Sequence, residues 1–461
     1  MRYAALDMRR EDDYLMRLRK EITHAQVQAP GGPRSAADLS RKDPMTTLES
    51  ARAQRRRDAL RFFWLVTDQA IYAGSNFITN VIFARWLSAT DYGLYSVSFS
   101  GFLFLSVLHY GAFLEPLLIQ SAQVGEQHRR SYVVAMGRVH AAMLAAVSVL
   151  SGLGFAATMY LGVPDAAWAI LGAGVGGTMV LVLITARRLC LVFLSAFTSA
   201  AIGALYFVGV LATVFLLHWA RDIFWAELWA IMGGWSLLCS LIIFGMLYRK
   251  TSGTETYSLR DLYRFQRRYA GWSITSSFCI WARFEGILLI LARLAGLEAV
   301  AQTRAILNLG NPLVQVINAM HASWLVRFST AHTEGRTQRV FGMAALYGAA
   351  VGVAVLILWV VATPLVSLLY AGKYTEYAWQ VPLVYLGLGF LGVDHMISSA
   401  FKARGLLTQG YVSQVSGAAV GLTAGLILIP LLGQPGAMYA ILVMYVGGAS
   451  LVAALMWRQS R

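Results

Sequence analysis

The feature that most constrains this sequence is a succession of long apolar runs with few charged residues. Hydrophobic residues make up 57% of the 461 residues and charged residues only 13%, whereas soluble domains carry about 25% charged residues. A helix that crosses a membrane needs about 20 mostly apolar residues, and many of the runs reach that length. The sequence therefore predicts an all-α, polytopic membrane protein and excludes a water-soluble fold.

Several charged residues nevertheless interrupt the apolar runs. An ionised side chain at bilayer depth costs at least roughly 2.5–3.5 kcal/mol on insertion, so it normally faces a protein-lined or watery interior. The residues concerned are Asp68, Glu115, Arg138, Arg283, Glu285, Arg304 and Asp394. We therefore predict helices around a polar interior, which is typical of a transporter rather than of a membrane-anchored enzyme.

The apolar runs predict twelve transmembrane helices. They span 62–86, 93–119, 133–160, 167–186, 193–217, 225–248, 271–295, 299–326, 340–362, 379–400, 409–431 and 437–457. Lys and Arg gather in every second connection, including Arg187 and Arg188, whereas the other connections offer only Arg221 and Lys373. Cytoplasmic loops carry the excess of Lys and Arg. This bias predicts that both termini are cytoplasmic, and it accounts for most of the net charge of +15 without nucleic acid.

The sequence also predicts two lobes of six helices each. The first predicted span ends in Ala84-Arg85 and the seventh in Ala292-Arg293, and each is followed by a short acidic turn and the next span. With six spans per lobe the two copies start on the same side, which is a parallel pseudo-two-fold repeat. The predicted parts are a basic, partly disordered segment (1–61), an N-lobe (62–248), a linker (249–270), a C-lobe (271–457) and a cytoplasmic tail (458–461).

Three of the predicted spans carry polar faces. Asp68, Asn76 and Asn80 share one broad face of the first span, because residues four and eight positions apart lie near one another on a helix. The seventh span holds Arg283 and Glu285, and the eighth holds Arg304, Asn308 and Asn311 at helical spacing. Any one of these could simply bond across helices, and Arg283 could pair with Glu285. Taken together, the three faces favour a shared cavity.

Other signals are weaker or absent. Glu115 could act in gating, and Asp394-His395 could be a proton-coupled pair, because a buried carboxylate beside an imidazole can titrate near neutrality; a capped or kinked helix end is the alternative. The sequence has no phosphate-binding GxxxxGK[ST] loop, HExxH or GxSxG motif, and its three cysteines lack metal-site spacing. We therefore expect neither an enzyme nor a metal protein, and no cofactor.

Five short stretches carry a resemblance to a known family. Asp68-Gln69-Ala70 and Gly74-Ser75-Asn76-Phe77 precede Ala84-Arg85-Trp86-Leu87-Ser88-Ala89-Thr90-Asp91-Tyr92-Gly93. Later come Asn308-Leu309-Gly310-Asn311-Pro312 and Leu368-Leu369-Tyr370-Ala371-Gly372-Lys373-Tyr374. Over roughly residues 55–458 the chain resembles the polysaccharide flippase (Wzx-like) branch of the multidrug/oligosaccharidyl-lipid/polysaccharide exporter superfamily.

The resemblance implies a function and a site. Such proteins move undecaprenyl-diphosphate-linked oligosaccharides to the outer leaflet of the bacterial inner membrane by alternating access, for exopolysaccharide or O-antigen export, and a polymerase and glycosyltransferases of the same pathway are the implied partners. Guanidinium groups suit phosphate oxygens. The substrate-binding residues expected on this basis are Arg85, Arg283, Arg293, Arg304, Asn76, Asn80, Asn308 and Asn311. The coupling or gating residues are Asp68, Glu115, Glu285, Asp394 and His395.

Two alternatives remain open from the sequence. A cation-coupled drug or metabolite antiporter of the same superfamily would have the same fold, with Asp68 facing a cationic cargo. A non-transporting membrane component of a polysaccharide-synthesis complex could instead use the basic amino-terminal segment for docking. Coupling to a proton or a sodium gradient, the identity of the sugars and the oligomeric state are left undetermined.

Overall fold

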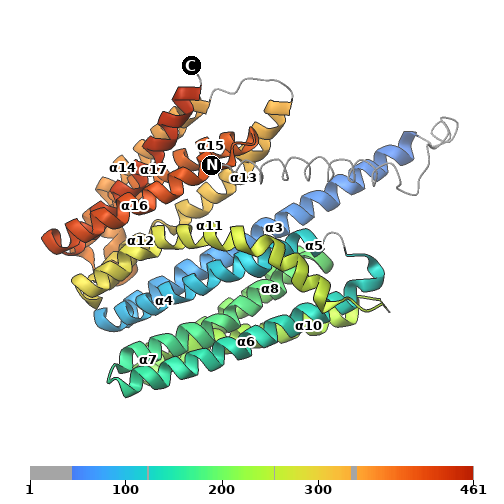
Figure 1. Cartoon of the computed structure of the whole chain (residues 1–461), viewed down its shortest axis with the longest axis horizontal. Helices are drawn as coiled ribbons and strands as arrows, with labels where there is room; N and C mark the ends of the chain where they lie inside the picture. The colour runs from blue at the N-terminus through green and yellow to red at the C-terminus, as the bar shows by residue number, and fades with distance from the viewer. Residues whose placement is uncertain (1–43, 122–123, 254, 334–339, 460–461) are drawn as a thin grey trace, which may run out of the picture. The chain divides into compact units, whose positions relative to one another are not determined.

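The computed structural model describes residues 44–121, 124–253, 255–333 and 340–459 (Figure 1). Two units can be distinguished, Met1–Phe62 and Phe63–Arg461. Of the predicted amino-terminal segment, residues 1–43 lie outside the described part, and the rest begins helix α3 (Pro44–Trp86). All further description concerns the second unit.

The described residues of this unit form helices joined by short turns. We call α3 (from Phe63) to α10 the first half and α11 to α17 the second half. The further elements of the first half are α4 (Ala89–His109), η1 (Tyr110–Leu114), α5 (Glu115–Ser121), η2 (Glu126–His128), α6 (Arg129–Tyr160), α7 (Pro164–Leu171), η3 (Gly172–Gly176), α8 (Gly177–Phe193), α9 (Ala196–Ala220) and α10 (Glu227–Lys250). The second half comprises α11 (Leu259–Leu294), α12 (Leu297–Asn308), α13 (Asn311–Thr333), α14 (Val340–Tyr370), η4 (Thr375–Gln380), α15 (Val381–Ala403), α16 (Leu407–Leu432) and α17 (Gln434–Gln459).

Nine helical segments of the described chain are long and apolar enough to cross a membrane. They correspond to nine of the twelve predicted spans. The other three predictions fall on α3, α11 and the α12–α13 pair, which are the segments that carry the polar faces noted in the sequence. The charged and amide residues that reduce the apolar character of these helices are therefore the same ones that suggest a cavity.

Local sequence explains where the helices begin. Ser88 precedes α4 and accepts a hydrogen bond from the Asp91 backbone N–H at 3.0 Å, as Ser195 does from Thr198 before α9. Such caps satisfy one of the free N–H groups of the first helical turn. At the corresponding junction of the second half, Gly296 has a φ of +89° before α12, a conformation that favours glycine.

The predicted loop between the fourth and fifth spans is wrong. The sequence predicts a loop from Arg187 to Val192, but α8 continues to Phe193 and α9 follows after two residues. Arg187 and Arg188 therefore lie within a helix. Arg187 can stay there because its guanidinium is paired with the Asp68 carboxylate at 2.6 Å, so its charge is compensated.

The two halves repeat the same helix neighbours. In the first half α8 packs on α10, α6 on α7 and α9 on α10; in the second half α15 packs on α17, α14 on α15 and α16 on α17. When the six spans are numbered within each half, these contacts are the same in both halves: the fourth span packs on the sixth, the third on the fourth, and the fifth on the sixth. This agreement supports the predicted parallel repeat.

Helix α4 joins the halves by packing against α11 and α12; Figure 1 shows α11 and α12 between the other helices of the two halves. At Gly93 of α4 the backbones come very close. An added Cβ there would lie 2.2 Å from the Leu297 carbonyl oxygen. The hydrophobic effect does not drive helices together in lipid. Helices there associate by close packing, which small residues permit.

Candidate functional site

A cavity of 280 Å³ lies where α4 meets helices of the second half. Its wall is mostly apolar, and the charged and amide side chains in it are Glu285 of α11, Arg304 of α12 and Asn311 of α13. Leu103 and Val107 supply the wall from α4. Because both halves bound this cavity, a relative movement of the halves would change its size.

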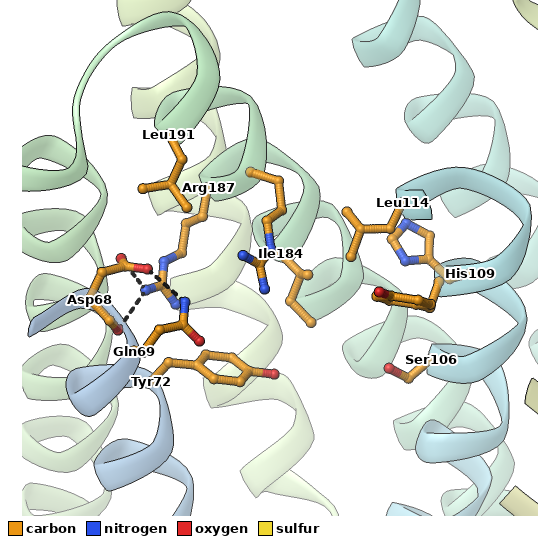
Figure 2. A pocket seen from close by; sticks show the side chains of 11 residues that line it. Asp68, Gln69, Tyr72, Ser106, His109, Leu114, Ile184, Arg187 and Leu191 are labelled. Atoms are coloured by element: carbon orange, nitrogen blue, oxygen red, sulfur yellow. Dashed lines mark hydrogen bonds and ion pairs between the residues drawn. The ribbon is translucent and has the colours of Figure 1, made fainter. Parts of the chain in front are cut away.

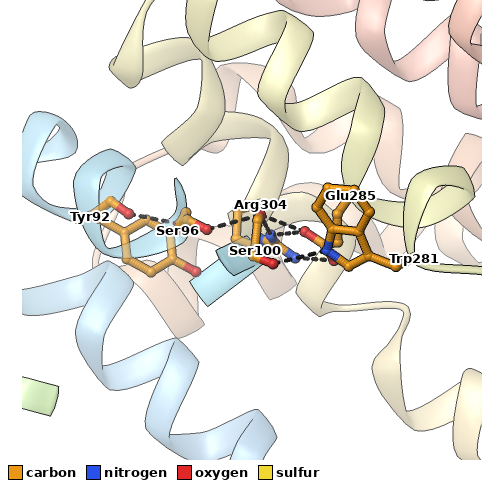
Figure 3. Close-up of polar contacts among 6 residues, drawn as sticks. All are labelled: Tyr92, Ser96, Ser100, Trp281, Glu285 and Arg304. Atoms are coloured by element: carbon orange, nitrogen blue, oxygen red, sulfur yellow. Dashed lines mark hydrogen bonds and ion pairs between the residues drawn. The ribbon is translucent and has the colours of Figure 1, made fainter. Parts of the chain in front are cut away.

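A three-residue cluster crosses from one half to the other beside this cavity (Figure 3). Arg304 donates to both oxygens of Glu285, at 3.2 Å from Nη1 and 2.5 Å from Nη2. Nη2 also donates to Ser100 Oγ of α4 at 2.9 Å, and Ser100 Oγ donates to Glu285 at 2.6 Å. Trp281 Nε1 donates to the Ser100 carbonyl oxygen at 2.9 Å. We call Ser100, Glu285 and Arg304 the interhalf cluster.

The interhalf cluster is buried and electrically balanced. The Arg304 and Glu285 side chains are 12% and 7% exposed. A guanidinium and a carboxylate joined by two parallel hydrogen bonds form a strong and specific pair, and a phosphate would meet the same fork of N–H groups. Within the described residues Arg304 Nε has no hydrogen-bond partner. An anion that replaced Glu285 would therefore meet a donor array that is already oriented.

A second buried pair lies within the second half. Arg283 Nη1 of α11 donates to Asp394 of α15 at 3.1 Å, and the side chains are only 3% and 2% exposed. Ser398 donates to the other Asp394 oxygen at 3.3 Å. The sequence left open a pairing of Arg283 with Glu285, but each of these two residues has a different partner. Among the described residues, Arg283 Nε and Nη2 lack partners.

A third buried pair lies within the first half (Figure 2). Arg187 Nη2 of α8 donates to Asp68 of α3 at 2.6 Å, and Ser199 of α9 donates to the same carboxylate oxygen at 2.7 Å. This pair lines a cavity of 230 Å³, and His109 lines the opposite wall. The sequence predicted a coupling or gating role for Asp68; in the structure its carboxylate is paired with Arg187.

The two pairs within the halves lie at corresponding places, but the positions of the arginine and the aspartate are exchanged. In the first half an aspartate of the first helix meets an arginine of the fourth span, whereas in the second half an arginine of the first helix meets an aspartate of the fourth span. In both halves a glycine of the fifth span leaves room for the guanidinium. A Cβ added at Gly203 would lie 3.2 Å from Arg187 Cζ, and a Cβ added at Gly417 would lie 3.5 Å from Arg283 Cζ. In each half one such buried pair thus joins the first helix to the fourth span.

Comparison with known proteins places this geometry in a family. Residues 61–332, more than half of the chain, match the polysaccharide biosynthesis protein family. The chain belongs to this family. No curated protein matches the sequence.

Solved structures share the fold of this polysaccharide biosynthesis protein. An inward-facing multidrug resistance MATE family transporter of the MOP superfamily has a TM-score of 0.68 at 13% identity, over 85% of this chain and 94% of that one. An outward-facing structure of such a transporter has a TM-score of 0.55 at 12% identity, over 87% and 94%. The lipid II flippase MurJ, in an inward closed conformation, has a TM-score of 0.55 at 12% identity, over 86% of each chain. The fold is therefore that of a membrane transporter.

Four further residues predicted to bind substrate do not line the 280 Å³ cavity: Arg85, Arg293, Asn76 and Asn80. Arg85 and Arg293 are exposed near the ends of α3 and α11. Asn80 donates to the Asn76 carbonyl oxygen of its own helix at 2.9 Å, and Asn76 itself is exposed.

The two asparagines of the second half bond to each other. Asn311 Nδ2 donates to Asn308 Oδ1 at 2.6 Å, and Asn308 Nδ2 lies 3.5 Å from the Phe77 carbonyl oxygen of α3. Asn311 is thereby held at the wall of the 280 Å³ cavity. Of the asparagines predicted from the sequence, this one lines the cavity beside the interhalf cluster.

Of the residues predicted to act in coupling or gating, two lie elsewhere. Glu115 is exposed at the beginning of α5. His395 follows Asp394 on α15 but faces His321 of α13, with 4.8 Å between the ring centroids. Adjacent residues of a helix project about 100° apart, so Asp394 and His395 have different neighbours.

Sequence reasoning missed Ser100, Trp281 and the role of Arg187. Serine and tryptophan are common in apolar helices, so nothing singles out Ser100 or Trp281 before their neighbours on α11 and α4 are known. Arg187 could have been recognised, because the apolar run around it continues to Phe193 and Ser195-Ala196-Phe197-Thr198 has the pattern of a helix start.

Proposed function

We propose that this protein moves an undecaprenyl-diphosphate-linked oligosaccharide from the inner to the outer leaflet of the bacterial inner membrane, with both termini in the cytoplasm. The observation that carries the proposal is the interhalf cluster. A transporter that alternates between two openings needs a site at the contact of its halves, and here a buried guanidinium occupies that contact beside a cavity bounded by both halves.

The chemistry of the cluster supports an anionic cargo. In the described state Glu285 neutralises Arg304 through two hydrogen bonds. A diphosphate can replace the carboxylate because it offers the same pair of acceptor oxygens. Binding would then free Glu285 from Arg304 and alter the bonds that join Ser100 of α4 to the second half. Recognition of the head group and opening of the halves are coupled by this exchange.

The size of the cavity supports a closed state. Pockets that hold a drug-sized ligand measure about 300–1,000 Å³, and the cavity here measures 280 Å³. A lipid-linked oligosaccharide head group is larger than a drug, so the halves must separate before the head group can enter. Polymerisation in the outer leaflet would follow translocation, which makes polysaccharide-synthesis enzymes the proposed partners.

Export of a polymer in cells tests the proposal. Deletion of the gene in a strain without a second flippase should trap the lipid-linked oligosaccharide in the cytoplasmic leaflet. Arg304→Gln should lower export about 10- to 100-fold, because a hydrogen bond to a charged group contributes about 1.5–3 kcal/mol. Arg221→Gln is the matched control: it breaks an exposed pair with Glu227 at 2.8 Å and should leave export unchanged. Undiminished export after Arg304→Gln, at normal amounts in the membrane, would contradict this site.

A drug antiporter is the second candidate, because a specific observation favours it. Trp281, Phe284 and Tyr445 give the cavity an aromatic wall, which suits a flat apolar cation. If the deletion strain exports its polymer normally but becomes sensitive to cationic dyes, the antiporter is the correct function.

A further inference from the structure

His109, in the wall of the 230 Å³ cavity of the first half, belongs to a polar cluster that the proposed exchange at Arg304 does not use. His109 is the last residue of α4, His140 lies in α6 and Thr185 in α8. The two Nε2 atoms are 3.1 Å apart, and Thr185 Oγ1 lies 3.1 Å from the first and 2.9 Å from the second. Both histidines are buried, with 3% and 1% of their surface exposed. Three helices of the first half thus bring three titratable or hydroxyl groups to one point.

The hydrogen-bond geometry limits the number of protons that this cluster can hold. His140 Nδ1 lies 2.9 Å from the Met136 carbonyl oxygen, which only accepts, so Nδ1 carries a proton. In the neutral ring Nε2 is then an acceptor, and it can receive the proton of His109 Nε2 or of Thr185. One added proton can be accommodated: His140 becomes an imidazolium that donates from Nε2 to the lone pair of His109, whose own proton then sits on Nδ1. A second added proton would set two N–H donors against each other at 3.1 Å.

The surroundings leave this cluster as the part of the cavity that can accept a proton. Asp68 already accepts hydrogen bonds from Arg187 and Ser199, so its charge is satisfied. Among the described residues, the other charged or titratable groups that line the cavity are Tyr72 of α3, Tyr110 of η1, and Arg187 and Arg188 of α8. Glu115 of α5 acts electrostatically on Tyr110. Arg138 on α6 is exposed, and it lies two positions from His140, which places it on another face of the helix. The cavity supplies a route for the proton, because His109 lines it.

The backbone beside His109 is also unusual. The π-helical turn η1 begins at the next residue, Tyr110. Such turns inside α-helices occur frequently at functional sites. The turn can change back to regular helix, which would rotate His109 relative to His140 and open the 3.1 Å contact.

We infer that His109, His140 and Thr185 form a proton-binding site that takes up one proton in each transport cycle. The proton bonds to a histidine Nε2 when the two rings are in contact and leaves by the cavity when the contact opens. The coupling to transport rests on the proposed function, whereas the uptake of a single shared proton is a property of the protein alone.

Proton uptake by the purified full-length protein tests the site without any cargo. When the protein in detergent is acidified from pH 8 to pH 4 and uptake is followed with an indicator dye, the double variant His109→Gln/His140→Gln should take up one proton fewer than the wild type. A difference of two protons would show two independent histidines, and a difference below half a proton would show that the cluster does not titrate; either result overturns the inference. Thr185→Val, which keeps the shape of the side chain, should weaken proton binding, whereas Thr185→Ser should preserve it.

Flipping of a fluorescent lipid-linked oligosaccharide in proteoliposomes tests the coupling. An imposed pH gradient should accelerate the wild type several-fold and should not accelerate His109→Gln or His140→Gln. His218→Gln, which removes an exposed histidine stacked on Trp86, should respond like the wild type. If the pH gradient does not change the rate of flipping by the wild type, the coupling is overturned and the proposed function stands. If the wild type does not flip the lipid at all, the proposed function is contradicted, and the proton-uptake measurement still decides whether the site binds a proton.

Discussion

At the scale of single residues, three buried arginine–carboxylate pairs stand out within the part of the chain that the structure describes. Two of them, Asp68–Arg187 and Arg283–Asp394, lie within one half each, whereas Glu285–Arg304 lies where the halves meet. Loss of one partner of a buried pair leaves an uncompensated charge, which typically costs about 3–5 kcal/mol. The pairs within the halves should therefore stabilise the protein, and the pair between them should respond to the cargo.

The Asp68–Arg187 pair should be required for stability. Asp68→Asn should lower the free energy of unfolding by about 3–5 kcal/mol, because Arg187 would remain buried without its carboxylate. The exchange Asp68→Arg with Arg187→Asp should recover part of that loss, since the second half already has its arginine on the first helix and its aspartate on the fourth span. Thermal unfolding in detergent measures both effects.

The matched control breaks an exposed pair. Glu227→Gln removes the partner of Arg221 at the first residue of α10, and exposed pairs contribute about 0–1 kcal/mol. If Asp68→Asn unfolds no more easily than Glu227→Gln, the buried pair does not stabilise the first half.

At the scale of elements, the sequence predicts the positions of the helices better than it predicts the partners of their polar residues. Nine of the twelve predicted spans coincide with apolar helices, because length and apolar composition determine them. The partner of each charged residue could not be predicted, since Arg283 and Glu285 are two residues apart yet bond to different helices, α15 and α12. Pairing depends on how helices pack, and a single sequence does not contain that information.

The crossing of α4 and α12 should tolerate no side chain at Gly93. Gly93→Ala would place a Cβ 2.2 Å from the Leu297 carbonyl oxygen, so the two backbones must move apart. Forced packing of this kind typically costs about 1–3 kcal/mol, and export should fall together with the unfolding temperature. Gly101→Ala on the same helix is the control, because its Cβ would lie at an ordinary 3.7 Å from Ala173 Cβ. Equal stability of the two variants would refute the close crossing.

At the scale of the whole second unit, the end predicted to face outward is held closed by contacts between the halves. Lys373, in the turn between α14 and η4, donates to the carbonyl oxygens of Arg85 at 2.8 Å and Leu87 at 2.9 Å. These carbonyls end α3, where a cation also interacts favourably with the helix dipole. Partial burial lowers the pKa of the Lys373 amine.

Removal of the Lys373 contacts should favour opening at this end. A charged hydrogen bond contributes about 1.5–3 kcal/mol, so Lys373→Met should raise the population of the open form about tenfold or more. A cysteine introduced as Leu297→Cys, at the crossing with Gly93, in a background without the three native cysteines, should then react correspondingly faster with a membrane-impermeant maleimide added from outside. Lys373→Arg retains a donor cation and should stay near the wild-type rate. Unchanged labelling in Lys373→Met would mean that the α4–α12 crossing alone keeps the halves together, and that the lysine only caps α3.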